Sequence, residues 1–337
     1  MKNRTKKAFS LIEIIFVLVI LGIVASISSQ IIAQVYENYI MQRAIYNVST
    51  KTEMAANQIV NRLAYRIQGS TISKVHEHFL LSKSSVDSGG ASSITADDWL
   101  PLKDVPTGTD YTTLEWIGYD NDSFAATQAP HWSGIANYED NVSINGFDTP
   151  GSKLEDAATI MNNLSDGKVD LTNTAPAAVM FAHKDKYYTG QNEYSPQCMG
   201  LIPELDKNTS CIFPVRRNGN VRLEFTRDND TNNAVLLPKI ITERYKLAWS
   251  AYAIVPVPID PNNPNNNLFN LMLHYNYQPW NGESYLDNTT KKSLLLPNVT
   301  VFKFTESGGV IKFKLCASEN IGEDFNVTTC KEKVVIR

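Results

Sequence analysis

The sequence predicts an α+β protein in which one long N-terminal helix packs on an antiparallel β-sheet head with large loop insertions. Three observations indicate this fold class. A long apolar run opens the chain, a helical spacing of apolar residues continues behind it, and the second half of the 337 residues contains short runs that alternate between apolar and polar side chains. Strands that follow a single long helix favour a sheet that buries its apolar face against that helix.

The first element is the apolar run. From Phe9 to Ala25 every residue is apolar or small except Glu13, and about 20 such residues suffice for a helix to cross a hydrocarbon core. Before it lies a basic patch of Lys2, Arg4, Lys6 and Lys7. Because basic residues stay on the cytoplasmic side, the N-terminus is expected inside and the rest of the chain outside. An ionised side chain near the bilayer centre costs on the order of 2.5 to 3.5 kcal/mol, so Glu13 needs a partner.

The junction before this run also indicates how the chain is processed. An ordinary secretory signal is cut after its apolar core, whereas here the small residue suited to a cut, Ala8, precedes the core. The stretch Lys7-Ala8-Phe9-Ser10-Leu11-Ile12-Glu13 resembles the class III leader junction of type IV pilins and type II secretion pseudopilins. The resemblance implies cleavage after Ala8, N-methylation of the new amine of Phe9 and a role of Glu13 in filament assembly. The family usually has Gly where this chain has Ala8. The alternative is a plain membrane anchor whose Glu13 reaches the head groups.

The same helix is expected to continue outside the membrane. From Ser28 to Gln68 the chain has no Pro and no Gly, and its apolar residues recur at spacings of three, four and seven. A helix from Phe9 to about Gln68 would be on the order of 90 Å long, and Gly69 is expected to end it. The predicted organisation is a leader at 1–8, a transmembrane half at 9–27, a periplasmic half at 28–69 and a head at 70–337 with insertions at about 82–174.

The head is predicted to be rich in β-strands. Alternation and β-branched or aromatic content favour strands at 114–119, 177–182, 187–189, 212–215, 221–226, 244–257, 268–277, 299–305, 310–315 and 333–336. One helix is expected at 154–164. The segments 243–255 and 294–304 are similar to the late strands of J-type minor pseudopilins and W-type minor pilins. A pilin-like fold is what both resemblances imply.

Four cysteines follow the apolar run: Cys198, Cys211, Cys316 and Cys330. In an oxidising periplasm an even number suggests disulfides, with three connectivities open. We favour pairing between nearest neighbours, which closes two short loops, each contributing about 3 kcal/mol in the loop-entropy model. The loop between Cys316 and Cys330 also resembles the C-terminal disulfide loop of many pilins. A metal site is disfavoured because no Cys-x-x-Cys pair exists and no His lies beside a Cys.

No enzymatic function and no cofactor are predicted. The chain lacks Gly-x-Ser-x-Gly, His-Glu-x-x-His and a phosphate-binding glycine loop. His76-Glu77-His78 is interpreted as a solvated polar patch. Asp120-Asn121-Asp122 and Asp228–Asn232 resemble the start of a calcium loop without its later Gly and Glu, so turn residues are the favoured interpretation, although some pseudopilins hold structural calcium. The five Trp residues, with many Tyr, could line a glycan or protein surface, but core packing is the default expectation for most of them.

Modification is the remaining sequence feature. Among many Asn-x-Ser/Thr triplets, three also have an acid two residues before the Asn: Asn141, Asn208 and Asn326. This longer pattern resembles the acceptor of bacterial N-glycosylation, so these three asparagines are candidate glycosylation sites.

The predicted function is that of a minor pseudopilin or minor pilin. The resemblance implies three partners, namely a prepilin peptidase, other pilin or pseudopilin subunits and an inner-membrane assembly platform. The protein would wait in the inner membrane, with a cytoplasmic N-terminus and a periplasmic head, and then enter a filament. A bulky head favours a tip position.

A net charge of −4 gives no overall basic field, so nucleic acid would be bound only indirectly, if at all. The alternatives are an abundant shaft subunit and a membrane-tethered adhesin or glycan-binding module, and the machine is left open among secretion, pilus and DNA uptake.

Overall fold

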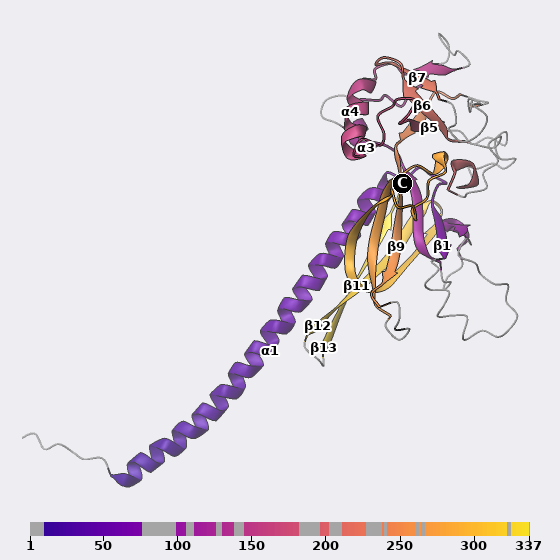
Figure 1. Cartoon of the computed structure of the whole chain (residues 1–337). Helices are drawn as coiled ribbons and strands as arrows, with labels where there is room; N and C mark the ends of the chain where they lie inside the picture. Colours follow the sequence, from indigo (N-terminus) through magenta and orange to yellow (C-terminus); the bar gives the residue numbers. More distant parts are fainter. Residues whose placement is uncertain are drawn as a thin grey trace, which may run out of the picture.

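The protein is α+β, as expected, with a long N-terminal helix that leads into a head of antiparallel sheets (Figure 1). The computed structural model describes residues 10–75, 99–105, 111–125, 130–137, 145–181, 196–201, 211–226, 238, 241–260, 263, 267–321 and 325–336. The head holds two sheets where the sequence suggested one.

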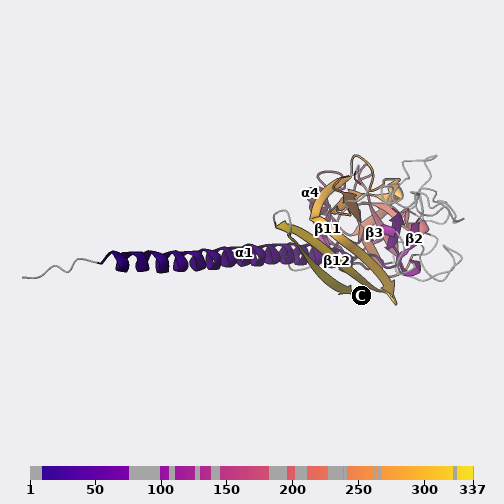
Figure 2. The same ribbon diagram turned by 90° about the horizontal axis from the view of Figure 1, so that it is seen from below.

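Helix α1 comprises Leu11–Ala64, 54 residues, and is therefore ~80 Å long. Its first half extends away from the head (Figures 1 and 2), and every residue from Ser10 to Tyr39 is exposed. Contact with the head begins in the second half. The buried residues recur at helical spacing: Ala44, Val48, Thr52, Ala55, Ala56, Ile59 and Leu63.

α1 ends at Ala64, before the Gly69 that the sequence marks as its end. The amide of Tyr65 donates to the carbonyl of Arg62 at 3.2 Å, and the amide of Ile67 donates to the carbonyl of Ile117 at 2.8 Å. Pairing with a strand of the head therefore takes over the backbone donors before the glycine is reached.

The large sheet has eight strands in the order β13-β12-β11-β10-β9-β3-β1-β2. All neighbouring strands are antiparallel, as expected. The strands are β1 (Ile72–Val75), β2 (Trp99–Pro101), β3 (Tyr111–Gly118), β9 (Ser250–Pro258), β10 (Phe269–Tyr277), β11 (Lys291–Ser307), β12 (Val310–Ile321) and β13 (Phe325–Val335). Because β3 lies between β9 and β1, the first half of the head contributes to the middle of the main sheet.

α1 covers one face of the large sheet, mainly over β13 and β12. Its residues Val48, Ile59 and Leu63 pack there with Leu114 and Trp116 of β3 and with apolar residues of β9 to β13. The 3₁₀ helices η2 (Pro196–Met199) and η4 (Pro279–Asn281) belong to the cluster on the opposite face. A third 3₁₀ turn, η1 (Leu102–Asp104), lies against β11. The opposite face is therefore covered over β1, β3, β9 and β10.

A second, five-stranded sheet forms what we call the distal lobe, together with α3 (Asn121–Phe124) and α4 (Leu154–Leu164). Its strand order is β4-β7-β6-β5-β8. The strands are β4 (Gly146–Asp148), β5 (Ala177–Phe181), β6 (Phe213–Arg217), β7 (Arg222–Phe225) and β8 (Tyr245–Ala248). α4 packs its apolar face on this sheet in a core of its own. The distal lobe lies beyond the C-terminal end of α1 (Figure 1).

The two sheets share one stretch of chain. β8 at the edge of the small sheet and β9 inside the large sheet are separated by Trp249 alone. The sequence predicted a single strand over 244–257, and the structure divides it at this residue. The amide of Asp120, just after β3, donates to the carbonyl of Leu247 at 2.7 Å, so β3 continues from one sheet toward the other in the same way.

The region of about 82–174, where the sequence predicted insertions, supplies regular elements to both parts of the head. β2, η1 and β3 belong to the large sheet or lie against it, and α3, β4 and α4 belong to the distal lobe. Strand β3 and helix α4 agree with the expected strand at 114–119 and the expected helix at 154–164. The expected strand at 187–189 lies outside the described residues.

Candidate functional site

The first candidate site is the N-terminal turn of α1. The amides of Glu13 and Ile14 donate to the carbonyl of Ser10 at 3.0 and 3.3 Å, so Ser10 is the residue from which the helix starts. Glu13 lies in the first turn and is exposed. A carboxylate there interacts favourably with the positive end of the helix dipole. Ala8 and Phe9 lie outside the described residues.

After Glu13 the helix is apolar, and the rest of the protein does not cover it. An 18-residue window of α1 has a mean hydropathy of 2.8, and none of it is buried within the protein. By length and composition α1 is the one helix in the described part of the chain that can cross a membrane. The exposed apolar residues continue beyond about 20 residues, the length that a bilayer requires. They are Ile31, Ile32, Val35, Tyr36 and Tyr39, between 54% and 69% exposed.

The second half of α1 is fixed to the sheet by polar contacts as well as by packing. Glu53 forms ion pairs with Lys333 and, at 3.6 Å, with Lys331, both on β13. Arg62 lies over the ring of Tyr252, with its guanidinium carbon 5.1 Å from the ring centre. Glu53 and Arg62 lie about two and a half turns apart, so α1 and the large sheet hold a defined relative position.

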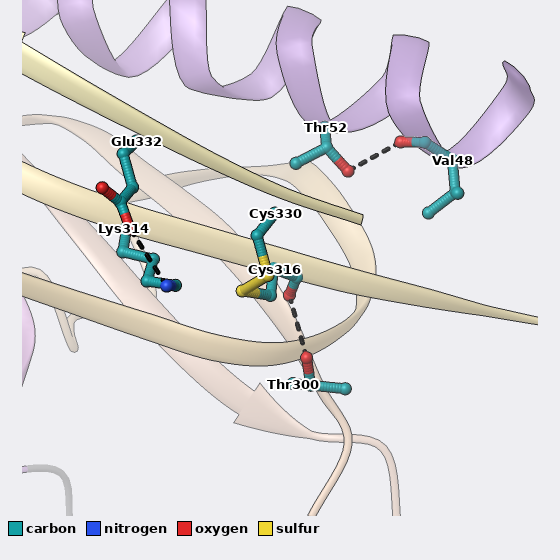
Figure 3. The surroundings of a disulfide bond; sticks show 7 residues. All are labelled: Val48, Thr52, Thr300, Lys314, Cys316, Cys330 and Glu332. Carbon is teal, nitrogen blue, oxygen red and sulfur yellow. Dashed lines mark hydrogen bonds and ion pairs between the residues drawn. A yellow bond between two sulfur atoms is a disulfide. The ribbon is translucent and has the colours of Figure 1, made fainter. Parts of the chain in front are cut away.

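The structure pairs the cysteines between nearest neighbours, as we favoured. Cys198 is joined to Cys211, and Cys316 is joined to Cys330. Cys316 and Cys330 face each other in register on β12 and β13, on the strands beneath α1, and Thr300 of β11 donates to the carbonyl of Cys316 at 3.3 Å (Figure 3). This disulfide therefore ties the edge strand β13, which α1 covers, to the rest of the sheet.

The other sequence candidates divide into two groups. His76-Glu77-His78, Asn141, Asn208 and Asp228–Asn232 lie outside the described residues, whereas Asn326 lies on β13 and is exposed. No group of three His, Cys, Asp or Glu residues suited to a metal occurs within the described ranges.

Asp120, the first residue of the calcium-like stretch Asp120-Asn121-Asp122, has a structural role as the cap of α3. Only 1% exposed, it caps α3, and its carboxylate accepts from the amide of Ser123 at 3.2 Å and from the Ser123 hydroxyl. Burial raises the pKa of Asp120 to about 6. The stretch that begins at Asp120 is therefore the cap and the single turn of α3, where the sequence suggested an ordinary turn.

The Trp residues agree with the expected core placement. Trp116, Trp132, Trp249 and Trp280 are at most 9% exposed, and Trp99 is half-buried. Four of the five Trp residues therefore pack in the core.

Sequence reasoning missed a buried charged cluster on the face of the large sheet opposite α1. Lys74 Nζ lies 2.7 Å from Glu115 Oε2, and the hydroxyl of Tyr277 donates to Glu115 Oε1 at 2.8 Å. Lys74 also donates to the carbonyl of Leu201 at 3.1 Å. Burial, and then the charge of Glu115, raise the pKa of Tyr277 well above its usual value. Lys74 beside the apolar Val75, and Glu115 between Leu114 and Trp116, were the available sequence signal. Because each group has a partner in the cluster, a structural role accounts for it.

One cavity of about 340 Å³ lies where the distal lobe meets the large sheet. Lys168 and Glu283 in its lining pair with each other at 2.7 Å, and Lys168 also donates to the carbonyl of Asn276 at 3.0 Å. Its charged groups are thus already used in joining the two parts of the head.

Comparison with known proteins supports the processing site at the N-terminus and gives no match for the head. Residues 3–29 match the family described as the prokaryotic N-terminal methylation motif. No curated protein and no solved structure matches the chain. The matched segment contains Ala8, Phe9 and Glu13. The motif implies a chain that a prepilin peptidase processes, as in pilins and pseudopilins.

Proposed function

We propose that this chain, as a carrier of the prokaryotic N-terminal methylation motif, is a minor pilin or pseudopilin. It is cleaved by a prepilin peptidase and enters, near the tip, a periplasmic or surface filament of a type II secretion or type IV pilus machine. The observation that carries this proposal is the exposure of the N-terminal half of α1. All residues from Ser10 to Tyr39 are exposed, although most are apolar, so they require lipid or other helices around them.

The exposed stripe beyond the membrane length supports assembly over simple anchoring. A plain anchor needs about 20 apolar residues. Ile31, Ile32, Val35, Tyr36 and Tyr39 follow that length and remain exposed, outside the contact with the head. Neighbouring subunits would remove this surface from water at about 25 cal/mol per Å² of apolar area.

Glu13 makes assembly into a filament energetically favourable. After cleavage the amine of Phe9 and the carboxylate of Glu13 are two charges in or near lipid, where separate charges are costly. Pairing Glu13 with the amine of a neighbouring subunit lowers that cost. Entry into the filament then satisfies a group that the single subunit leaves exposed at the first turn of its helix.

The distal lobe supports a position near the tip. It lies beyond the end of α1 (Figure 1), along the direction in which the helix points. In a shaft, a subunit further along the same filament would need that space for its own head. A tip-proximal subunit has fewer such neighbours.

The deciding experiment compares Glu13→Ala with Glu37→Ala, which removes an exposed acid from the same helix outside the apolar run. The readout is the fraction of the protein in sheared filaments, with membrane fractionation and intact mass as controls. We expect Glu13→Ala to be cleaved and inserted normally but depleted from filaments, and Glu37→Ala to behave as the wild type. Normal incorporation of Glu13→Ala would refute the proposed pairing.

Two further measurements separate the alternatives. Ala8→Leu should abolish cleavage, which intact mass detects as retention of residues 1–8. Quantitative proteomics of sheared filaments should find this chain at a few copies per filament, whereas abundance equal to the main subunit would identify a shaft protein. Binding of the exported part to cells or glycans in a strain without the secretion or pilus machine would support a tethered adhesin instead.

A further inference from the structure

We propose that Asn326, on the edge strand β13, is the acceptor of an N-linked glycan. The argument compares all Asn-x-Ser/Thr triplets that the structure describes. A transferase must reach both the side-chain amide of the Asn and the hydroxyl two residues later, so both must be accessible in the folded, exported protein. The described triplets begin at Asn47, Asn121, Asn163, Asn288, Asn298 and Asn326.

Three of these triplets have hydroxyls that are buried and used by the fold. Ser123 is fully buried and bonded to Asp120. Ser165 is 1% exposed, and its hydroxyl oxygen accepts from the amide of Val169 at 2.8 Å. Thr290 is 5% exposed and donates to the carbonyl of Ser284 at 2.8 Å. A transferase could bind these hydroxyls only after local unfolding.

Two more triplets are hindered by their place in the fold. Asn47 and Ser49 are half-buried inside α1, beside Val48 in the core under the sheet. Thr300 is half-buried and donates to the carbonyl of Cys316 at 3.3 Å. Among the described triplets, this leaves the one that begins at Asn326.

At Asn326 both required groups are open. Asn326 and Thr328 are exposed, and β13 is the last strand of the large sheet, with β12 as its one neighbour. Asn326 is the second residue of β13 and pairs with Asn320 of β12. An acceptor near a strand end can leave its pairing at the smallest cost in ordered backbone.

The side chains of Asn326 and Thr328 also point away from α1. Successive residues of a strand face opposite sides of the sheet. Val327 packs against the core beneath α1, and Lys331 and Lys333 pair with Glu53 of the helix. The even-numbered residues of β13 therefore face the other side, where a bulky group meets neither α1 nor its exposed apolar half. A glycan at Asn326 is thus compatible with filament packing through α1.

The sequence before the triplet agrees with this choice. Asp324 stands two residues before Asn326, in the longer pattern that resembles the bacterial acceptor. None of the other described triplets has an acid at that position. The exposure of the two groups and the acid at this position are independent observations that select the same residue.

The chemical step balances without an oxidant or a reductant. Nδ2 of Asn326 attacks C1 of the first sugar of an oligosaccharide carried on a lipid diphosphate. The C1–Nδ2 bond forms, the C1–O bond to the diphosphate breaks, and the lipid diphosphate leaves with the electron pair of that bond. One amide proton passes to a base of the transferase.

The test uses the full-length protein purified from the cells that export it. After reduction and alkylation, trypsin releases the peptide of residues 315–331, which contains Asn326, and mass spectrometry measures its occupancy. We expect a sugar mass on Asn326 that is lost in Asn326→Gln and in Thr328→Ala and is retained in Thr328→Ser. Asn298→Gln, which removes an exposed Asn of a triplet without the acid, is the matched control and should leave the intact mass shift unchanged.

The contrary results are equally clear. An unmodified 315–331 peptide at full abundance would overturn the proposal, as would a sugar mass that persists in Thr328→Ala. Because the readout is a covalent mass, failure here leaves the proposed role in filament assembly untouched, and failure of that role leaves this result untouched.

Discussion

Arg66, just beyond the end of α1, donates to the carbonyl of Gly309 in the turn between β11 and β12 at 2.7 Å. The two residues are 243 positions apart in the chain. A second nitrogen of the same guanidinium donates to the carbonyl of Leu63 at 2.9 Å, and Arg66 is only 2% exposed. One buried side chain thus joins the last turn of the helix to the hairpin of the C-terminal strands.

Replacing Arg66 should destabilise this joint. Arg66→Met leaves one buried and one half-buried carbonyl without their charged donor. Hydrogen bonds to charged groups contribute about 1.5 to 3 kcal/mol each, so we expect a loss of about 2 to 3 kcal/mol in the free energy of unfolding. Chemical denaturation of the exported part, residues 28–337, measures it. Lys51→Met is the control, because Lys51 is 57% exposed and lies 4.0 Å from Glu319, and should cost less than about 0.5 kcal/mol. Equal losses in the two variants would contradict this role of Arg66.

The two disulfides should differ in their rate of reduction. Cys330 is exposed, whereas Cys198 and Cys211 are 1% and 2% exposed within a core cluster. A reductant must reach a sulfur to attack it, so Cys316 and Cys330 should be alkylated first when the folded protein is treated with a mild reductant. Differential alkylation followed by mass spectrometry gives the order, and in denaturant the difference should disappear. Earlier labelling of Cys198 and Cys211 would show that the exposure of Cys330 does not control access.

Asp120 should make stability depend on pH. Burial raises its pKa to about 6 in the folded protein, against about 3.9 in an unfolded chain. The folded state therefore binds more protons between these values, and the contribution of Asp120 to stability is full below pH 4 and is lost as pH rises toward 6 and above. The difference of about two units corresponds to roughly 3 kcal/mol.

Asp120→Asn tests this dependence directly. The amide keeps an oxygen that caps α3 and carries no charge, so we expect this variant to be more stable than the wild type at pH 7.5 and to have a flatter stability profile between pH 4 and 7. Denaturation midpoints across that range measure the profile. Parallel profiles for the two proteins would contradict the assignment to Asp120.

The small residues of α1 should set its distance from the sheet. Ala56 is fully buried between the helix and the strands, and enlarging a residue in a packed core costs about 1 to 3 kcal/mol. Ala56→Leu should therefore lower the free energy of unfolding by that amount. Asn61→Leu, on the exposed face of the same helix, should be nearly neutral. A neutral Ala56→Leu would show that the helix can move away from the sheet without loss.

The long helix and the membrane motif could be predicted because both are local patterns. Apolar spacing over many turns identifies α1, and a motif of a few residues places Glu13 in its first turn. Helix α4 was predicted with the bounds that the structure shows, Leu154–Leu164, since its apolar residues recur on one face between a turn and a polar loop.

The features that could not be predicted from the sequence depend on pairing between distant segments of the chain. β11 begins at Lys291, eight residues before the expected Val299, and runs through Pro297, a residue that normally argues against a strand. Phe269 faces Val299 and Leu271 faces Leu296, so Pro297 and Asn298 form a bulge, with Asn298 at a φ of 54°. The partition of the head into two sheets, like the Lys74–Glu115 pair, joins segments far apart in the chain, and local alternation contains no information about such partners.

The passage of one stretch of chain through both sheets has a mechanical consequence. A pull on the distal lobe, directed away from the membrane, is transmitted through Trp249 into β9 along its length. β9 is hydrogen-bonded to β3 on one side and β10 on the other, so such a load shears two ladders at once instead of opening one bond after another.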